Sequence, residues 1–436
     1  MPARWRTARI EDVAERVAMG PFGSSIKVET FVLEGIPVIT GQHLHGYKID
    51  DNAGFKFITK EHAERLRNAS VKRGDIVLTH RGNIGQVSIV PENSKFERYI
   101  VSQSQFYMRC DRSKAIPEFV MAYLKSPDGQ HKLLANASQV GVPSIAQPVT
   151  YLRTIEIPLP PISEQRAIAE ILDSLNDKIA SNRRVNDTLE TMARAIFKSW
   201  FVDFAPVRAK VESRDTWLPA DIANHFPSRL VDTELGDIPK GWVPATIKDL
   251  SLLNPETWKN DTRPATINYV DLSNTKWGRI ESVTEYAQDE APSRAQRVLR
   301  RGDTIVGTVR PGNGSYAFVS EDGLTGSTGF AVLRPIREHY EEFVYLAATA
   351  KDSIEALSHL ADGAAYPAVR PEVVAARPII SPGDIILEKF SQTVGPLLAG
   401  ISNNERESRT LASIYDTLLH RLIMGEIRVD AKRRPQ

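Results

Sequence analysis

A heptad pattern that occurs twice limits what this chain can fold into. Apolar or amide residues recur every seven positions in two segments that lie 222 positions apart, a pattern typical of coiled-coil helices. The two sets are Ile168, Leu175, Asn182, Leu189 and Ile196, and Phe390, Leu397, Asn404, Leu411 and Leu418. A companion row, three positions after the first set, holds Ile171, Lys178, Val185 and Met192. We therefore expect two long helices that pack against each other.

Each helical segment carries one amide in its apolar row, Asn182 in the first and Asn404 in the second. A single Asn in such a row fixes register and partner number at some cost in stability. We expect the two side chains to meet where the helices pack. The alternative is that both are solvated on the helix surface.

The first helix has a clear starting signal. Pro160 and Pro161 cannot donate a helical hydrogen bond and Ser163 is a good N-cap, so the helix is predicted to begin near Glu164. Roughly 38 helical residues at about 1.5 Å each would span about 57 Å. That length indicates a spacer between domains.

The segments before the helices also repeat. The matching stretches are 5–13 with 242–250, Arg73-Gly74-Asp75 with Arg301-Gly302-Asp303, and Pro143 with Pro367. We predict an α+β fold, built as a tandem duplication of a globular α/β domain followed by a long helix. The predicted divisions are a domain over 1–158, a helix over 159–205, a linker over 206–240, a domain over 241–380, a helix over 381–427 and a tail over 428–436.

Each domain contains a predicted strand, turn and strand in which the turn carries Arg and Asn. The strands are 76–79 and 87–90 in the first copy, and 304–309 and 316–319 in the second. Arg can contact phosphates or guanine edges and Asn can contact adenine edges. An exposed Arg beside a turn Asn is nevertheless common in proteins of every function.

A further strand is predicted from Ile100 to Met108, with Gln103 and Gln105 on one side as a DNA-reading face. The alternative is an ordinary solvent-facing strand. The complete set of predicted base and phosphate contacts is Lys27, Arg81, Asn83, Gln103 and Gln105 in the first domain, and Lys276, Arg279, Arg310 and Asn313 in the second.

Composition and missing motifs exclude several classes of protein. The 436 residues are 42% hydrophobic, contain no run long enough for a membrane helix, and begin without a signal peptide, so a cytoplasmic protein is predicted. Cys110 is the only cysteine, which excludes an internal disulfide. Phosphate-binding, zinc-protease, hydrolase and methyltransferase motifs are absent, so no catalytic residue is assigned. His43 and His45 are more typical of solvated loop residues than of a metal site, and no metal is predicted.

The net charge is low for a protein that grips DNA alone. The whole chain carries +1; residues 1–160 hold 21 basic and 16 acidic side chains, and residues 241–380 hold 15 and 18. Phosphate neutralisation supplies most non-specific DNA affinity. Either the ligand is not nucleic acid or partner subunits supply the phosphate contacts.

Three motifs carry a resemblance to a known family. Leu159 to Gln165 (Leu-Pro-Pro-Ile-Ser-Glu-Gln), Phe197 to Phe204 and Leu235 to Trp242 resemble the DNA specificity subunit of type I restriction-modification systems. In the second copy Ser381-Pro382-Gly383-Asp384 replaces the Leu-Pro-Pro motif, and Glu388 is the only acidic residue near the Glu-Gln position. The start of the second helix is therefore less clear.

The resemblance implies a non-catalytic subunit whose two target recognition domains each read one half of a split sequence in double-stranded DNA. An antiparallel helix pair would separate the domains and set the length of the unread spacer. Two methyltransferase subunits carrying S-adenosylmethionine would methylate adenine, and restriction subunits would use ATP and Mg²⁺. Those partners would also account for the low charge.

Aromatic residues at the end of the first helix, Trp200, Phe201 and Phe204, are predicted to contact a partner subunit. The alternative is that they pack against the second helix of the same chain. An alternative for the whole protein is an interaction scaffold that binds no DNA.

Overall fold

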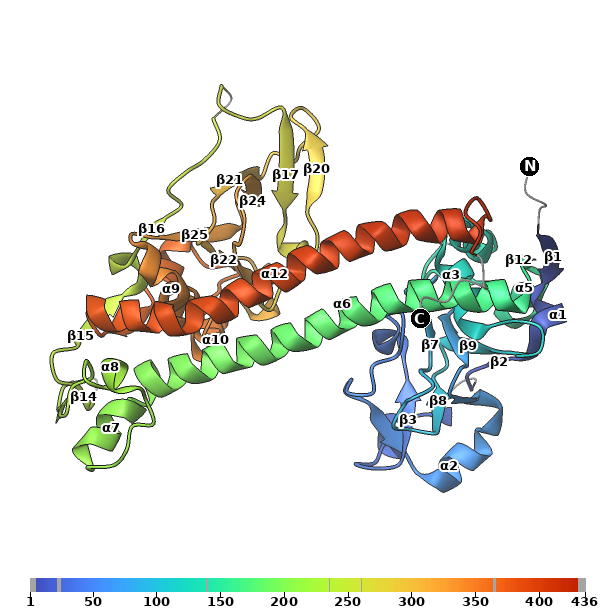
Figure 1. Ribbon diagram of the computed structural model, residues 1–436, viewed down its shortest axis with the longest axis horizontal. Coiled ribbons are helices and arrows are strands. Elements are labelled where there is room, and N and C mark those ends of the chain that lie inside the picture. Colours follow the sequence, from blue (N-terminus) through green and yellow to red (C-terminus); the bar gives the residue numbers. More distant parts are fainter. Residues whose placement is uncertain are drawn as a thin grey trace. The chain divides into compact units, whose positions relative to one another are not determined.

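The computed structural model describes residues 5–21, 25–138, 140–234, 236–259, 261–363 and 366–429. The chain forms two compact units: unit 1 is Met1–Ser181 with Glu407–Gln436, and unit 2 is Asn182–Arg406. Both boundaries fall inside the long helices α6 (Ile162–Phe197) and α12 (Asp384–Ile423) (Figure 1). Each unit therefore contains one globular domain and a segment of both helices.

Unit 1 is built on two four-stranded sheets. The first has the order β2-β9-β6-β7 and is antiparallel, and the second has the order β4-β3-β8-β5 with β3 parallel to β8. The strands of the first are β2 (Ala14–Met19), β9 (Gln105–Cys110), β6 (Ile76–Thr79) and β7 (Val87–Ile89). Those of the second are β4 (Lys56–Ile58), β3 (Ile36–Ile39), β8 (Arg98–Val101) and β5 (Ser70–Lys72).

Side-chain alternation explains why the first sheet is buried on both faces. Along β6, Ile76 and Leu78 enter one apolar cluster whereas Val77 enters another; along β9, Met108 and Tyr107 divide in the same way. The first cluster also contains residues of α3 (Pro117–Lys125), α6 and α12. The core of unit 1 thus lies between this sheet and the long helices.

Shorter elements complete unit 1. Strand β1 (Arg6–Arg9) pairs with β12 (Glu156–Leu159), and a small hairpin consists of β10 (Ala137–Ser138) and β11 (Ser144–Ile145). The remaining helices are α1 (Ile10–Val13), α2 (Lys60–Arg65), α4 (Pro127–Leu134) and α5 (Pro148–Thr154). Helices α3, α4 and α5 each begin with proline, whose missing N–H has no helical acceptor at that position.

Unit 2 repeats this topology. Its sheets have the orders β16-β25-β22-β23 and β20-β17-β24-β21, again with one parallel pair, β17 with β24. The strands are β16 (Ser251–Leu253), β25 (Phe330–Pro335), β22 (Thr304–Gly307), β23 (Tyr316–Phe318), β20 (Thr284–Ala287), β17 (Thr266–Val270), β24 (Leu324–Ser327) and β21 (Ala295–Leu299). The predicted tandem duplication is confirmed.

The smaller elements of unit 2 follow the same plan. Strand β15 (Val243–Thr246) pairs with β26 (Pro378–Ser381), as β1 pairs with β12 in unit 1. The other elements are β13 (Leu230–Val231), β14 (Ile238–Pro239), β18 (Thr275–Lys276), β19 (Arg279–Ile280), α7 (Ala205–Val211), α8 (Ala220–Ala223), α9 (Glu341–Ala348), α10 (Lys351–His359) and α11 (Pro371–Ala375). The segment predicted as a linker includes α7 and α8, and its Val207 and Phe226 are buried in the core of unit 2.

The predicted hairpins are confirmed, but one predicted strand is wrong. Strands β6 and β22 pair antiparallel with β7 and β23. The segment from Ile100 to Met108, however, is not one strand, because β8 ends at Val101 and β9 begins at Gln105. Gln103 lies in the turn between them, so the two glutamines do not share a strand face.

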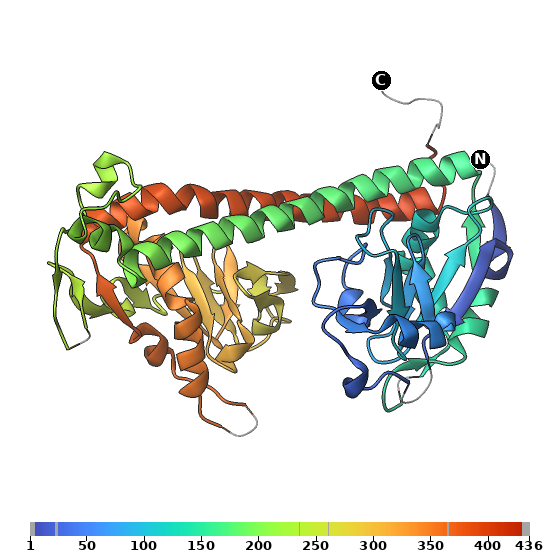
Figure 2. The same ribbon diagram turned by 90° about the horizontal axis from the view of Figure 1, so that it is seen from below.

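The long helices run antiparallel within each unit, and Figures 1 and 2 both show them side by side. In unit 1, Lys178 pairs with Glu407 at 3.1 Å, and Ile168 shares an apolar cluster with Leu419. In unit 2, the amide of Asn182 donates to the carbonyl of Asn404 at 3.4 Å. As the residue numbers rise along α6, the numbers of the contacting residues on α12 fall, as expected for antiparallel helices.

The companion row of the first helix is displaced by one residue from its predicted position. Val185 is 44% exposed and Met192 is 47% exposed, whereas Asn186 and Ala193 are buried. The inward-facing row thus lies four positions after the first set and contains the buried Leu172, Asn186, Ala193 and Trp200 and the half-buried Ile179. Heptads alternate steps of three and four, and the apolar pair Ile171-Leu172 is compatible with either step.

The aromatic residues predicted to contact a partner are instead buried within unit 2. Trp200, Phe201 and Phe204 are at most 8% exposed. The Phe201 ring lies 4.8 Å from that of Phe390 on α12 and 4.9 Å from that of Phe343. The predicted partner interface is therefore wrong, and the alternative, packing against the chain's own second helix, is the one observed.

Across the described ranges, no helix combines the length and apolar character that crossing a membrane requires.

Candidate nucleic-acid interface

Loops that follow β3, β6 and β8 meet at one edge of unit 1, which we name loop edge 1. It comprises 40–43, 80–86 and 102–104. The N–H of Ser102 donates to Ile39 at 2.9 Å, the N–H of His80 donates to Ser104 at 3.0 Å, and the side-chain amide of Gln86 donates to Gly41 at 3.1 Å. Because β3 and β8 are parallel, their carboxyl ends lie at the same edge.

Three predicted contact residues lie on loop edge 1. Arg81, Asn83 and Gln103 are exposed there. The β10–β11 hairpin is attached to the same edge, since the N–H of Gly82 donates to Pro143 at 2.9 Å. Lys27 is exposed at a separate turn that precedes the short 3₁₀ segment Val28–Thr30.

Gln105 does not belong to the exposed surface. It is 1% exposed, its amide donates to the Thr79 hydroxyl at 3.3 Å, and it accepts from the Ser102 hydroxyl. The prediction that Gln105 contacts bases is wrong, because its polar atoms bond to the end of β6 and to the loop that carries Gln103. Its role in loop edge 1 is to position neighbouring chain segments.

Two residues beside β3 complete loop edge 1. His43 is buried, accepts the N–H of Thr40 at 2.9 Å through Nδ1, and stacks on Phe55 at 4.4 Å. Burial lowers the pKa of His43, which favours the neutral ring. Gln42 is exposed beside it and was missed by sequence reasoning; its position just after a buried strand could have indicated it. Within the described ranges, no cluster of three or more His, Cys, Asp and Glu side chains is arranged to hold a metal ion.

Equivalent loops meet in unit 2, at what we name loop edge 2. It comprises 271–278, 308–315, 327–329 and 366–368. The N–H of Thr308 donates to Gly329 at 2.8 Å and the N–H of Arg310 donates to Pro367 at 2.7 Å, the counterparts of the His80 and Gly82 bonds in unit 1. The N–H of Trp277 donates to Gly314 at 2.7 Å, which attaches the β18–β19 turn.

The backbone bonds correct the predicted correspondence between the two arginines. Arg310 occupies the place of Gly82, not of Arg81, because both residues donate to the equivalent proline carbonyls. Both also have left-handed backbones, with φ of +87° at Gly82 and +48° at Arg310. The structural counterpart of Arg81 is Val309, which pairs with Ala368 as Arg81 pairs with Ser144.

The predicted residues of unit 2 divide into two groups. Arg310, Asn313 and Lys276 are exposed on loop edge 2. Arg279 forms an ion pair with Asp187 of α6, so its guanidinium is directed at the helix. Sequence reasoning missed two exposed aromatic residues, Trp277 at 60% and Tyr366 at 72% exposure.

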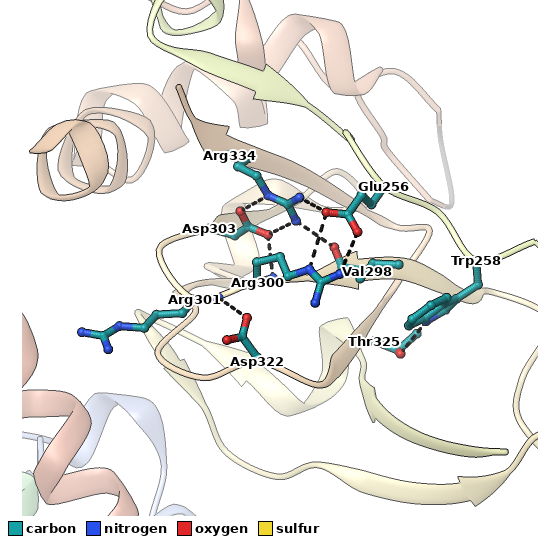
Figure 3. Close-up of polar contacts among 9 residues, drawn as sticks. All are labelled: Glu256, Trp258, Val298, Arg300, Arg301, Asp303, Asp322, Thr325 and Arg334. Carbon is teal, nitrogen blue, oxygen red and sulfur yellow. Dashed lines mark hydrogen bonds and ion pairs between the residues drawn. The ribbon is translucent and has the colours of Figure 1, made fainter. Parts of the chain in front are cut away.

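The repeated Arg-Gly-Asp motif has a structural role at the starts of β6 and β22, the strand ends opposite the two loop edges. Asp303 is fully buried and receives two hydrogen bonds of 2.8 Å from the guanidinium of Arg334, which also contacts Glu256 (Figure 3). Arg301, the motif's arginine, points away from this pair. In unit 1 the equivalent Asp75 receives bonds of 2.8 and 2.7 Å from Arg109.

Both arginines have a second carboxylate near them. The hydrogen bonds that Arg109 donates to Asp75 raise the pKa of Arg109, so the guanidinium stays charged. In unit 2 the hydrogen bond from Arg300, joined by that from Arg334, lowers the pKa of Glu256. The buried aspartate therefore faces a permanent cation in each unit, and a second carboxylate lies near that cation, Glu15 at 4.0 Å from Arg109 in unit 1 and Glu256 beside Arg334 in unit 2.

Comparison with known proteins agrees with this duplicated architecture. Residues 2–191 match the family model described as the type I restriction modification DNA specificity domain. The chain is 25% identical to the type I restriction enzyme MjaIX specificity subunit of Methanocaldococcus jannaschii, over 99% of this chain and 95% of that protein. It is 24% identical to the HindI specificity subunit of Haemophilus influenzae, over 82% and 87%.

A solved structure shares the fold. The crystal structure of the type I restriction-modification system S subunit from M. genitalium superposes with a TM-score of 0.56 at 15% identity, and covers 97% of this chain and 96% of that one. Residues 2–191 match the type I restriction modification DNA specificity domain, and nearly the whole chain is similar to specificity subunits of type I restriction enzymes.

Proposed function

We propose that this chain reads a two-part DNA target, with loop edge 1 contacting one half and loop edge 2 the other. The observation that carries the proposal is that the same loops, fixed by equivalent backbone bonds, expose different side chains in the two units. Arg81, Asn83 and Gln103 stand on one edge, and Arg310, Asn313 and Lys276 on the other. Side chains of these types bind base edges and phosphates. Equivalent frames with different side chains are suited to two different half-sites.

Methylation and cleavage belong, in this proposal, to partner subunits. Two methyltransferase subunits would carry S-adenosylmethionine and methylate adenine, and restriction subunits would supply the chemistry that needs ATP and Mg²⁺. The net charge of +1 supports this division between subunits. A nearly neutral chain neutralises few DNA phosphates, so the partner subunits would provide most of the phosphate contacts. This chain itself would hold no cofactor and catalyse no step.

The test is to purify the chain with the methyltransferase subunit encoded beside it and to map methylated adenines across the host genome. A split motif with a fixed unread spacer is expected, and it should disappear when the chain is deleted. A matched strain producing the Arg81→Ala, Asn83→Ala variant should lose or change one half of the motif only.

The opposite result would favour a scaffold that binds no DNA. In that case the chain would purify without the methyltransferase, and its deletion would leave the methylation pattern unchanged. Retention of every methylated site in the loop variant, with normal protein levels, would also contradict the assignment of loop edge 1.

A further inference from the structure

Arg310 adopts a backbone conformation that side-chain-bearing residues rarely take. Its φ is +48°, in the left-handed region, and its counterpart in unit 1 is a glycine, Gly82. Glycine adopts this region freely, whereas a Cβ atom makes it unfavourable. A residue kept in such a conformation where glycine would serve points to a function of its side chain.

The surrounding bonds hold Arg310 in place. Its N–H donates to Pro367 at 2.7 Å and its carbonyl accepts from Asn313 at 2.9 Å. Pro311 follows it as a buried first residue of the 3₁₀ segment Pro311–Asn313, which closes the turn. The direction in which the side chain leaves the backbone is thus set by both flanks.

An aromatic ring supports the guanidinium of Arg310. The central carbon of the group lies 4.8 Å from the ring centroid of Tyr366. Tyr366 is 72% exposed, and Arg310 is exposed as well, so the stacked pair stands at the surface of loop edge 2. An aromatic face can hold a guanidinium plane in one orientation.

That arrangement matches the edge of one base. Guanine presents two acceptors, O6 and N7, in the major groove, and a guanidinium fork donates to both. A phosphate can also accept two hydrogen bonds from a guanidinium. It can do so from many directions, so a phosphate contact would not need a turn and an aromatic ring that fix the orientation of the guanidinium. We propose that Arg310, supported by Tyr366, reads a guanine in the half-site that unit 2 recognises; this inference rests on the proposed function.

The experiment uses the full chain in complex with its methyltransferase subunits and a duplex containing the mapped target. Each guanine of the half-site read by unit 2 is replaced in turn by 7-deazaguanine, which lacks the N7 acceptor. At one position, wild-type binding should weaken by about 5-fold to 150-fold. The variants Arg310→Lys and Arg310→Gly should be weakened on the normal target by a similar factor and should be indifferent to that replacement.

Arg310→Gly and two further variants separate the possible causes. Glycine suits the left-handed backbone at position 310, so the unfolding temperature of Arg310→Gly should equal or exceed that of wild type. Loss of folding then cannot explain its weaker binding. Tyr366→Leu should weaken discrimination at the same guanine only. Arg301→Lys, an exposed arginine that points away from the buried pair, should bind as wild type does.

The outcomes that overturn the inference are distinct from failure of the proposed function. A loss in Arg310→Lys that is equal on target and unrelated duplexes would identify a phosphate contact. A half-site without guanine, or an undiminished response of the variants to 7-deazaguanine, would also exclude the inference while leaving sequence-specific binding intact. If the wild-type complex prefers no sequence at all, the proposed function fails, and the inference fails with it.

Discussion

A buried aspartate and its arginine occupy equivalent places in the two units, Asp75 with Arg109 and Asp303 with Arg334. Each aspartate follows a glycine with φ near +80°, at Gly74 and Gly302, which brings the carboxylate under the neighbouring strand. The repeated Arg-Gly-Asp sequence is therefore a turn that ends in a buried ion pair. Its own arginine is dispensable to that pair.

Removing Arg334 should destabilise unit 2 severely. Arg334→Ala leaves the Asp303 carboxylate buried without a cation, and breaking such a pair costs about 3–5 kcal/mol. Arg301→Ala, the matched control in the same motif, should cost less than about 0.5 kcal/mol. Urea unfolding followed by tryptophan fluorescence measures both, because five of the six tryptophans lie in unit 2. Equal losses in the two variants would show that the motif acts through its exposed arginine.

Glu341 predicts a pH dependence of stability. Burial, followed by the nearby Glu342 and Glu338, raises the pKa of the Glu341 carboxyl to about 7 from an ordinary 4.5. Since the folded pKa is the higher one, this group stabilises the fold fully below pH 4.5, and the contribution is lost as the pH rises through 7.

Glu341→Gln should therefore be more stable than wild type by roughly 1–3 kcal/mol at about pH 8, and by much less near about pH 5. Denaturant unfolding at both pH values measures the difference. Glu355→Gln, an exposed substitution on α10, serves as the control and should show no such trend. A stabilisation of Glu341→Gln that is the same at both pH values would contradict the assigned ionisation.

The contacts of a single side chain were harder to predict from the sequence than the position of a turn. The exposure of Arg81 and Asn83 followed from the Gly-rich turn that contains them, and the structure agrees. Gln105 was misassigned because a two-residue period alone cannot show that a strand stops at Val101 and restarts at Gln105. Whether a glutamine bonds to solvent or to a neighbouring loop depends on contacts that are distant in sequence.

At the scale of elements, the long helices place amides at the contact between them. The side chain of Asn404 donates to the amide oxygen of Asn186 at 2.8 Å, and Asn186 is 5% exposed. Sequence reasoning selected Asn182 and Asn404 but not Asn186, because it placed the companion row one residue too early. Three asparagines, rather than two, form the polar contact.

A double-mutant cycle tests that contact. Asn186→Ala and Asn404→Ala should each cost about 1–3 kcal/mol, because each breaks the hydrogen bond between the two amides and leaves a buried or half-buried amide without that partner. The double variant should cost less than the sum by at least about 0.5 kcal/mol. The control cycle combines Asn186→Ala with Asn403→Ala, a substitution at an exposed position, and should show no coupling. Additive losses in the first cycle would mean that the amides do not interact in solution.

The strongest periodic signals predicted the elements best. Heptads and turn residues gave the two helices and both hairpins, since these patterns depend on local spacing. The fate of Trp200, Phe201 and Phe204 could not be read in the same way. A run of aromatic residues has the same appearance whether it faces a partner or the rings of Phe343 and Phe390, which lie far along the chain.

At the scale of the whole molecule, the two copies share their topology but differ in what their loops expose. Sequence offsets that shrink along the chain predicted the duplication, because insertions accumulate in loops and leave strand order unchanged. The loop chemistry could not be predicted in the same way. Tyr366 precedes Pro367 as Val142 precedes the equivalent Pro143, so comparison of the copies gave no signal for this aromatic residue.

The duplication predicts that the two half-sites can be altered separately. Arg310→Ala with Asn313→Ala should change the half of the methylated motif that differs from the one affected by Arg81→Ala with Asn83→Ala. Genome-wide mapping of methylated adenine in each strain provides the measurement, and protein abundance provides the control. If either pair of substitutions changed both halves, reading by independent units would be excluded.

The discontinuity of unit 1 has a consequence for the order in which a nascent chain can fold. Unit 2 is one continuous stretch, Asn182–Arg406, whereas unit 1 needs residues from both ends of the sequence. Tyr415, Leu419 and Ile423 are buried in the core of unit 1 and are synthesised after all of unit 2. Unit 1 therefore cannot complete its core until residues 407–423 of α12 are made, whereas unit 2 needs that helix only as far as Arg406 and can complete its core earlier.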